Sequence, residues 1–149
     1  MRVEHQSIVE ARPDRVWDVL RDVERWPEWT PTMRQVRQVE GEGFMEGAGF
    51  EVRQPGQPAR IWRVRSIRPG GSFAWEAEGR LGTLRATHRL EADGDKTRND
   101  VSLEADGMLA ILLLPLRPTL RAALRREARG LQQACAGRML GQVRADAPG

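Results

Sequence analysis

The order in which the hydrophobic period changes along this 149-residue chain constrains its fold more than any other feature of the sequence. Apolar residues recur at helical spacing near the N-terminus, then at every second position through six short segments, and again at helical spacing toward the C-terminus. Turn sequences such as "GEG", "RPGG" and "ADGD" separate the six segments. Strands that follow one another through short turns predict an antiparallel meander.

Seven strands are expected in all, because one further segment with partial alternation precedes the N-terminal helix. A twisted sheet of this size can curl around a long helix and leave a space between them, which is a natural ligand cavity. The predicted strands are Val3–Glu10, Gln35–Glu40, Gly49–Gln54, Ala59–Ile67, Ser72–Glu78, Thr83–Glu91 and Arg98–Ala105.

Prolines help to place the helices. A first helix is predicted over Pro13–Arg25, because proline suits the first helical turn and the apolar residues that follow it have helical spacing. Pro27 disfavours helical backbone at Trp26, so the chain is expected to change direction and to form one short second helix before Pro31. The helical period then returns over Leu116–Gly141 and predicts one long terminal helix.

Composition favours one soluble domain over residues 1–149. Apolar residues make up 40% and charged residues 30% of the chain, which is the balance of globular rather than disordered or membrane proteins. The single cysteine, Cys135, excludes an internal disulfide framework, and the N-terminus lacks the apolar core of a secretory signal, so a cytoplasmic location is expected. The longest apolar run, Met108–Leu114, is far shorter than the roughly 20 residues that span a bilayer, so no stable membrane insertion is expected.

Four stretches resemble a known family: "PDRVWDVLRDVERWPEWTP", "IWRVRSIRPGGSFAWE", "THRLE" and "LRREARGLQQA". Together they are similar to the polyketide cyclase/dehydrase-like branch of the START-related (SRPBCC), helix-grip superfamily, over nearly the whole chain. The resemblance implies an α+β helix-grip fold, with a seven-stranded antiparallel sheet curled around a long C-terminal helix and two short helices after the first strand. It is specific for the fold and weak for the activity, because the superfamily includes both enzymes and carriers.

His88 is the first candidate for a functional role. Strand alternation places it on one face with Leu84, Ala86 and Leu90, and this apolar face is expected to point inward. An imidazole in a cavity can act as a general acid or base, or donate a hydrogen bond to a ligand. The alternative is a buried histidine that a neighbouring polar group satisfies.

Glu127 is the second candidate, because it falls on the apolar stripe of the terminal helix with Leu120, Leu124 and Leu131. A carboxylate there either faces a wet cavity, where it contacts ligand, forms an ion pair with an inward arginine of the sheet, or has its pKa raised by burial. Arg138 continues the same stripe near the helix end. The arginines considered as partners are Arg53, Arg63 and Arg65.

Aromatic residues are expected both in the core and around the cavity. Trp62, Phe73 and Trp75 lie on inward faces of their strands, where one side chain can serve both purposes. Trp26 and Trp29 are interpreted as packing residues that wedge the short helices against the core. The predicted ligand-binding residues are His88, Glu127, Trp62, Trp75, Phe73, Leu84, Leu120, Leu124 and Leu131.

Several classes of function lack their sequence signals. The chain has no G-x-S-x-G, H-E-x-x-H or P-loop motif, and neither histidine has a second ligand at metal-binding spacing, so no metal or cofactor is expected. The arginine-rich outer face of the terminal helix has no interleaved aromatic residues, so it is interpreted as a solvated face and nucleic acid is not expected as a partner. This face carries Arg117, Arg121, Arg125, Arg129 and Gln132.

Binding of a hydrophobic small molecule, lipid-like or polyketide-like, is the expected function. The alternative is an enzyme of the polyketide cyclase/dehydrase type in which His88 or Glu127 moves protons. A third hypothesis assigns the apolar Met108–Leu114 segment to docking on a partner or a membrane surface. The sequence leaves the ligand, the reaction and the oligomeric state open, a homodimer included.

Overall fold

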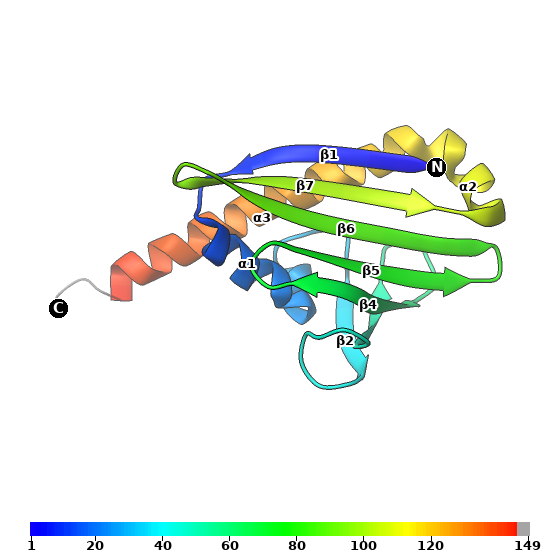
Figure 1. Ribbon diagram of the computed structural model, residues 1–149, viewed down its shortest axis with the longest axis horizontal. Helices are drawn as coiled ribbons and strands as arrows, with labels where there is room; N and C mark the ends of the chain where they lie inside the picture. The colour runs from blue at the N-terminus through cyan, green and yellow to red at the C-terminus, as the bar shows by residue number, and fades with distance from the viewer. Residues whose placement is uncertain (146–149) are drawn as a thin grey trace.

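The fold of residues 1–145 is a curled antiparallel sheet with helices on one side (Figure 1), and a computed structural model describes the side chains up to residue 137. The strand order is β1-β7-β6-β5-β4-β3-β2, so every neighbour except β1 next to β7 is also a neighbour in sequence. The expected helix-grip architecture is confirmed. The strands are β1 (Arg2–Val9), β2 (Gln35–Glu40), β3 (Gly49–Arg53), β4 (Arg60–Arg68), β5 (Ser72–Gly79), β6 (Gly82–Asp93) and β7 (Lys96–Ala105).

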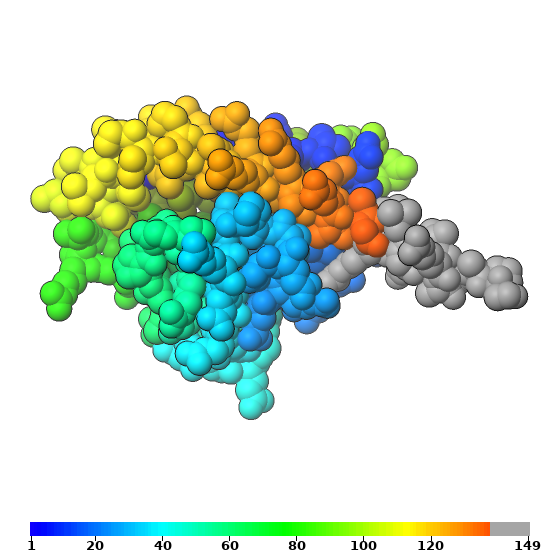
Figure 2. Space-filling model, turned by 180° about the vertical axis from the view of Figure 1, so that it is seen from behind, coloured from blue at the N-terminus to red at the C-terminus, as the bar shows by residue number. Residues whose placement is uncertain are grey.

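The helices lie on the sheet face that Figure 2 shows, where the long terminal helix and the segment after the first helix come together. All predicted strands are present, and their ends differ from the prediction by no more than two residues. The helical regions differ more, and their bounds are α1 (Pro13–Arg21), the 3-10 helix η1 (Val23–Glu28), α2 (Gly107–Leu113), the 3-10 helix η2 (Leu114–Leu116) and α3 (Arg117–Ala145).

The first helix ends four residues earlier than predicted, at Arg21, and Trp26 lies inside a 3-10 helix rather than at a break. This helix consists of two successive turns, in which Arg25 N donates to Asp22 O over 3.1 Å and Trp29 N donates to Trp26 O over 3.0 Å. Pro27 follows the first residue of the second turn, where no backbone N–H is needed. The predicted proline effect therefore changes the type of helix instead of ending it.

The apolar segment before the terminal helix forms a helix of its own, α2, which the sequence analysis left unassigned. Gly107 begins this helix with φ of +58°, and a Cβ there would lie 2.9 Å from Leu81 O. Asp106 fixes the same junction, because its Oδ1 accepts the Thr83 N–H over 2.7 Å. Glycine thus allows α2 to start directly against the turn between β5 and β6.

Helix α3 packs closely on the segment after η1. A Cβ on Gly130 would overlap the carbonyl oxygen of Trp29 and approach its ring carbon Cε3 to 3.1 Å. Leu131 and Cys135, on the same part of the helix, are almost fully buried in the main core. The absence of a side chain at Gly130 therefore lets the helix backbone approach Trp29, which is half-buried against that core.

Candidate functional site

An internal cavity of about 350 Å³ lies between the sheet and the helices α2 and α3. Seven of the nine sequence-predicted site residues line it: His88, Glu127, Trp62, Trp75, Leu84, Leu120 and Leu124. The other two, Phe73 and Leu131, are 1% exposed and lie in the core outside the lining. Both residues face inward as expected, and they belong to the main hydrophobic core instead of the cavity wall.

Fourteen of the 21 residues that line the cavity are not among the predicted ligand-binding residues. Trp26 was assigned to packing alone, and it contributes to both the core and the lining. The α2 helix had not been assigned, so the leucines that it and η2 place at the cavity were not foreseen. Val101 and Leu103 of β7 could have been predicted, because they continue the alternation of inward-facing residues along that strand. The main additional lining residues are Trp26, Val101, Leu103, Leu109, Leu113 and Leu116.

One side of the cavity is a wall of indoles. The ring centroids of Trp26 and Trp75 are 5.3 Å apart, and those of Trp62 and Trp75 are 5.4 Å apart. The Trp26 indole donates its Nε1–H to the carbonyl oxygen of Leu20 over 2.9 Å. Because this polar atom is satisfied within the protein, the ring presents an apolar surface in a fixed orientation.

His88 and Glu127 meet at the cavity from opposite elements, β6 and α3. Nε2 of His88 lies 3.3 Å from Oε1 of Glu127, and the two side chains are 3% and 13% exposed. The imidazole stacks on Phe73 at a centroid distance of 4.9 Å and an interplanar angle of 11°, and it contacts the edge of Trp26 at 5.3 Å. Aromatic rings therefore hold the imidazole on two sides.

Burial shifts the two groups toward their neutral forms. Desolvation lowers the pKa of His88 to about 3 and raises the pKa of Glu127 to about 7. The contact has ion-pair distance, yet Oε1 of Glu127 and Nδ1 of His88 have no hydrogen-bond partner among the described residues. At neutral pH the site thus holds a neutral imidazole and a carboxyl group close to half protonation, with polar atoms left for a ligand.

The arginine partners considered for Glu127 lie elsewhere. Arg63 pairs with Glu40 over 2.7 Å, and Arg65 pairs with Glu76 over 3.1 Å, both on the surface. Arg53 is exposed and lies beside a glutamate of its own strand. Arg138 is outside the residues whose side chains the structure describes. The inward partner of Glu127 is therefore the other candidate residue, which the sequence analysis had considered separately.

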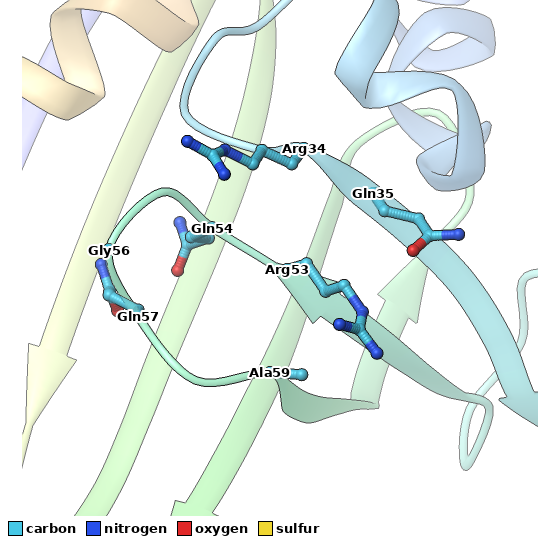
Figure 3. A pocket seen from close by; sticks show the side chains of 7 residues that line it. All are labelled: Arg34, Gln35, Arg53, Gln54, Gly56, Gln57 and Ala59. Carbon is cyan, nitrogen blue, oxygen red and sulfur yellow. The ribbon is translucent and has the colours of Figure 1, made fainter.

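A polar depression adjoins the cavity at the loop between β3 and β4 (Figure 3). Gln54 and Gln57 line both spaces, so the depression and the cavity share a boundary. Figure 3 shows Arg34 and Gln54 extending to one side of the loop, while Arg53 points away from them. The apolar cavity therefore has a polar rim at this end.

The described residues offer no site for a metal ion. Within residues 1–137, no three histidine, cysteine, aspartate or glutamate side chains gather closely enough to coordinate one. The side chains of the cavity themselves offer apolar contact, hydrogen bonding and proton transfer at His88 and Glu127.

A curled sheet that closes over a long C-terminal helix around an internal cavity defines the helix-grip fold. Sequence then identifies the particular family. Residues 1–139 match the family described as polyketide cyclase / dehydrase and lipid transport, and the chain belongs to this family. No curated protein matches the sequence significantly.

Solved structures share the fold at low sequence identity. A START superfamily protein from Mycobacterium smegmatis is 16% identical with a TM-score of 0.76, and the match covers 91% of this chain and 97% of that one. A hypothetical protein of Helicobacter pylori is 14% identical with a TM-score of 0.79, covering 91% and 88%. The di-domain ARO/CYC protein BexL of the BE-7585A biosynthetic pathway is 16% identical with a TM-score of 0.71, covering 89% of this chain and 45% of BexL.

Proposed function

We propose that the protein binds a hydrophobic small molecule, lipid-like or polyketide-like, in the cavity between the sheet and the C-terminal helices. The observation that carries this proposal is the cavity itself, whose volume of about 350 Å³ falls in the range of small-molecule sites. Its wall consists mainly of indole and aliphatic side chains, with His88 and Glu127 as a compact polar spot. Membership of a family described by cyclase, dehydrase and lipid-transport activities supports the same class of ligand.

The buried polar pair disfavours an anionic ligand group, because the His88 imidazole is uncharged at neutral pH. A ligand carboxylate placed beside it would lose its hydration without gaining a positive charge. A hydroxyl or carbonyl group can instead bond to the polar atoms of His88 and Glu127 that lack partners. The proposed ligand is therefore an apolar molecule that carries a hydroxyl or keto group.

Calorimetric titration with 2-naphthol, an apolar ring system with one hydroxyl group, tests this proposal. Ala123 lines the cavity and Ala122 does not, although both alanines are half-buried on α3. Ala123→Phe should abolish binding by filling the cavity, and Ala122→Phe should leave it intact. Binding that survives Ala123→Phe would show that the ligand does not occupy the cavity.

The polar pair is tested with the same ligand and with naphthalene, which lacks the hydroxyl. Glu127→Gln or His88→Ala should weaken 2-naphthol binding roughly three- to tenfold, the effect of about one hydrogen bond. Naphthalene should bind the wild type and both variants with similar affinity. If both variants bind 2-naphthol like the wild type, the pair does not orient the ligand.

An enzymatic role is a second candidate, and the 3.3 Å contact between His88 and Glu127 favours it. A carboxyl group with a pKa of about 7 is suited to general acid and base catalysis near neutral pH. Cyclisation or dehydration of a poly-β-keto thioester would show a pH dependence near 7, and Glu127→Gln should remove it. Binding without turnover of such a substrate would leave the protein as a carrier.

A further inference from the structure

The segment formed by α2 and η2 carries an unusual number of exposed hydrophobic side chains. Within the described residues ten large hydrophobic side chains are exposed, five of them belong to this segment, and a sixth, Leu81, lies in the adjoining β5–β6 turn. Ile111 is 67% exposed and Met108 is 56% exposed. In Figure 2 this segment forms a projecting end of the molecule, coloured yellow. We call the six residues the apolar tip: Leu81, Met108, Ile111, Leu112, Leu114 and Leu116.

The apolar tip is not needed to complete the protein core. The opposite side of the same segment already faces inward, where Leu109 and Leu113 line the cavity. Leu109 is 9% exposed, in contrast to the residues of the tip. A short helix that is apolar on all sides and buried on only one of them leaves a face that requires another apolar environment.

Basic residues border the apolar tip. Arg80 precedes Leu81 in the β5–β6 turn, Arg121 lies in the first turns of α3, and both are exposed, whereas Arg117 is half-buried and donates to the carbonyl oxygen of Arg2. Residues 107–126 contain four arginines and no acidic residue, and the carboxylate of Asp106, which precedes them, accepts the Thr83 N–H. An apolar surface bordered by positive charge is complementary to a bilayer with anionic headgroups.

We propose that the apolar tip docks on the surface of an anionic lipid bilayer, with α2 and η2 in the interface and the exposed Arg80 and Arg121 at the phosphates. This interaction is separate from the binding of a ligand in the cavity and does not depend on it. A two-fold pair of copies joined through this surface would bring their bordering arginines together, which is electrostatically unfavourable. The bilayer is therefore the occupant that the charge pattern favours.

Docking at the membrane surface also agrees better with the packing of α3 on the sheet than a membrane-spanning helix would. The stretch Gly107–Gly137 is long and apolar enough to cross a membrane by length and composition. Its α3 part, however, supplies Leu124 and Leu131 to the packed interior, and a 3-10 helix with Pro115 interrupts it after α2. Crossing a membrane would remove α3 from the sheet, whereas surface docking uses only the part that is already exposed.

Sedimentation of the protein with lipid vesicles tests the proposal. Vesicles of equal parts phosphatidylcholine and phosphatidylglycerol should bind the protein, pure phosphatidylcholine vesicles should bind it much less, and added salt should weaken binding. Met108→Asp or Ile111→Asp should reduce affinity at least about tenfold. Met45→Asp is the matched control, because Met45 is equally exposed, at 56%, and lies in the β2–β3 turn outside the tip.

A second pair of variants, Arg121→Gln and Arg68→Gln, tests the contribution of positive charge to vesicle binding. Arg121→Gln should weaken binding roughly fivefold, from about 1 kcal/mol for one basic residue at an anionic surface. Arg68→Gln, at the end of β4 away from the tip, should leave it unchanged. All of these positions are exposed, so near-wild-type melting temperatures are expected and identify effects on binding alone.

Four results would overturn the proposal. The first is no preference for anionic vesicles, and the second is an equal loss of binding in Met45→Asp and Ile111→Asp. The third is a concentration-dependent dimer in light scattering that Ile111→Asp abolishes, which would assign the tip to a second copy of the chain. Binding that resists both high salt and alkaline carbonate would indicate insertion instead of surface docking and would equally contradict it.

Discussion

The cavity is bounded by aromatic rings on one side and by aliphatic side chains on the other, and the two sides differ in what supports them. Trp26 and Trp75 are almost fully buried, and the core continues behind them. Leu109 and Leu113 belong to a short segment whose far side is exposed. A wall with packed layers behind it resists displacement, whereas a single exposed layer can move with little loss of contact. We therefore expect the cavity to open on the aliphatic side.

Removal of the central indole should have the largest effect. Trp26→Ala is expected to lower the free energy of unfolding by about 3 to 5 kcal/mol, because it deletes a buried aromatic side chain and leaves the Leu20 carbonyl without its donor. Chemical denaturation measures this loss. Trp29→Ala is the comparison and should cost less, because Trp29 is only half-buried. An equal loss of unfolding free energy in Trp26→Ala and Trp29→Ala would show that the two indoles contribute equally to the core.

The charge state of the polar pair should appear in the pH dependence of stability. Glu127 titrates at its ordinary pKa of 4.5 when unfolded and at about 7 in the fold, so the native state holds the extra proton between these values. Stability then falls as pH rises through this window, by about 3 kcal/mol in total. Glu127→Gln removes that loss.

His88 makes the free energy of unfolding depend on pH in the opposite direction. The contribution of Glu127 is therefore measured as the difference between Glu127→Gln and the wild type. The pKa of His88 is 6.5 when unfolded and about 3 in the fold, so the unfolded state holds the extra proton and stability rises with pH across that range. The two effects oppose each other between pH 4.5 and 6.5 in the wild type. The unfolding free energy of Glu127→Gln minus that of the wild type should increase from pH 4.5 to 7, and a constant difference would contradict the raised pKa.

The contact between α3 and Trp29 tests the core packing behind the aromatic side of the cavity, and the expected change in stability is smaller than for Trp26→Ala. Gly130→Ala should destabilise the protein by about 1 to 3 kcal/mol, because its Cβ would overlap the Trp29 carbonyl oxygen. Gly137→Ala is the control in the same helix, since a Cβ there meets nothing within 4 Å. That control should stabilise the helix by up to about 1 kcal/mol. Thermal unfolding of the two variants should therefore show shifts of opposite sign.

The smallest effect is expected at the apolar tip. Ile111→Ser should change the free energy of unfolding by no more than about 0.5 kcal/mol, because the side chain is 67% exposed and does not belong to the buried core. Denaturation in the absence of lipid measures it. A loss of 2 kcal/mol or more, on the order of a buried aliphatic truncation, would show that the tip packs against something in solution and would break the contrast between the two cavity sides.

The strands were predictable because their alternation is a local property. Each strand buries one face, so the pattern survives in the sequence and fixes the inward direction of His88. The helix α2 was missed because "MLAILLL" is apolar throughout and carries no helical period. Apolar residues occur both on the side of α2 that lines the cavity and on the side that is exposed, so the sequence does not distinguish the two sides.

The pairing at the site depended on tertiary structure. Alternation on β6 and the stripe on α3 each indicated an inward residue, but neither pattern contains the distance between two elements. The 3.3 Å contact of His88 with Glu127 results from how far α3 is shifted along the sheet, which Gly130 helps to set. The same shift places Leu131 in the core beyond the cavity, although its position on the stripe matched that of Leu124.

The indole wall has an optical consequence. The chain contains five tryptophans and no tyrosine, and three of the five indoles, those of Trp26, Trp62 and Trp75, border the cavity. Their neighbouring ring centroids, 5.3 and 5.4 Å apart, are close enough for the electronic transitions of the rings to couple. Near-ultraviolet emission and circular dichroism therefore originate largely at the cavity wall. A molecule that occupies the cavity should change both spectra, so the protein carries an intrinsic, label-free reporter of its own occupancy.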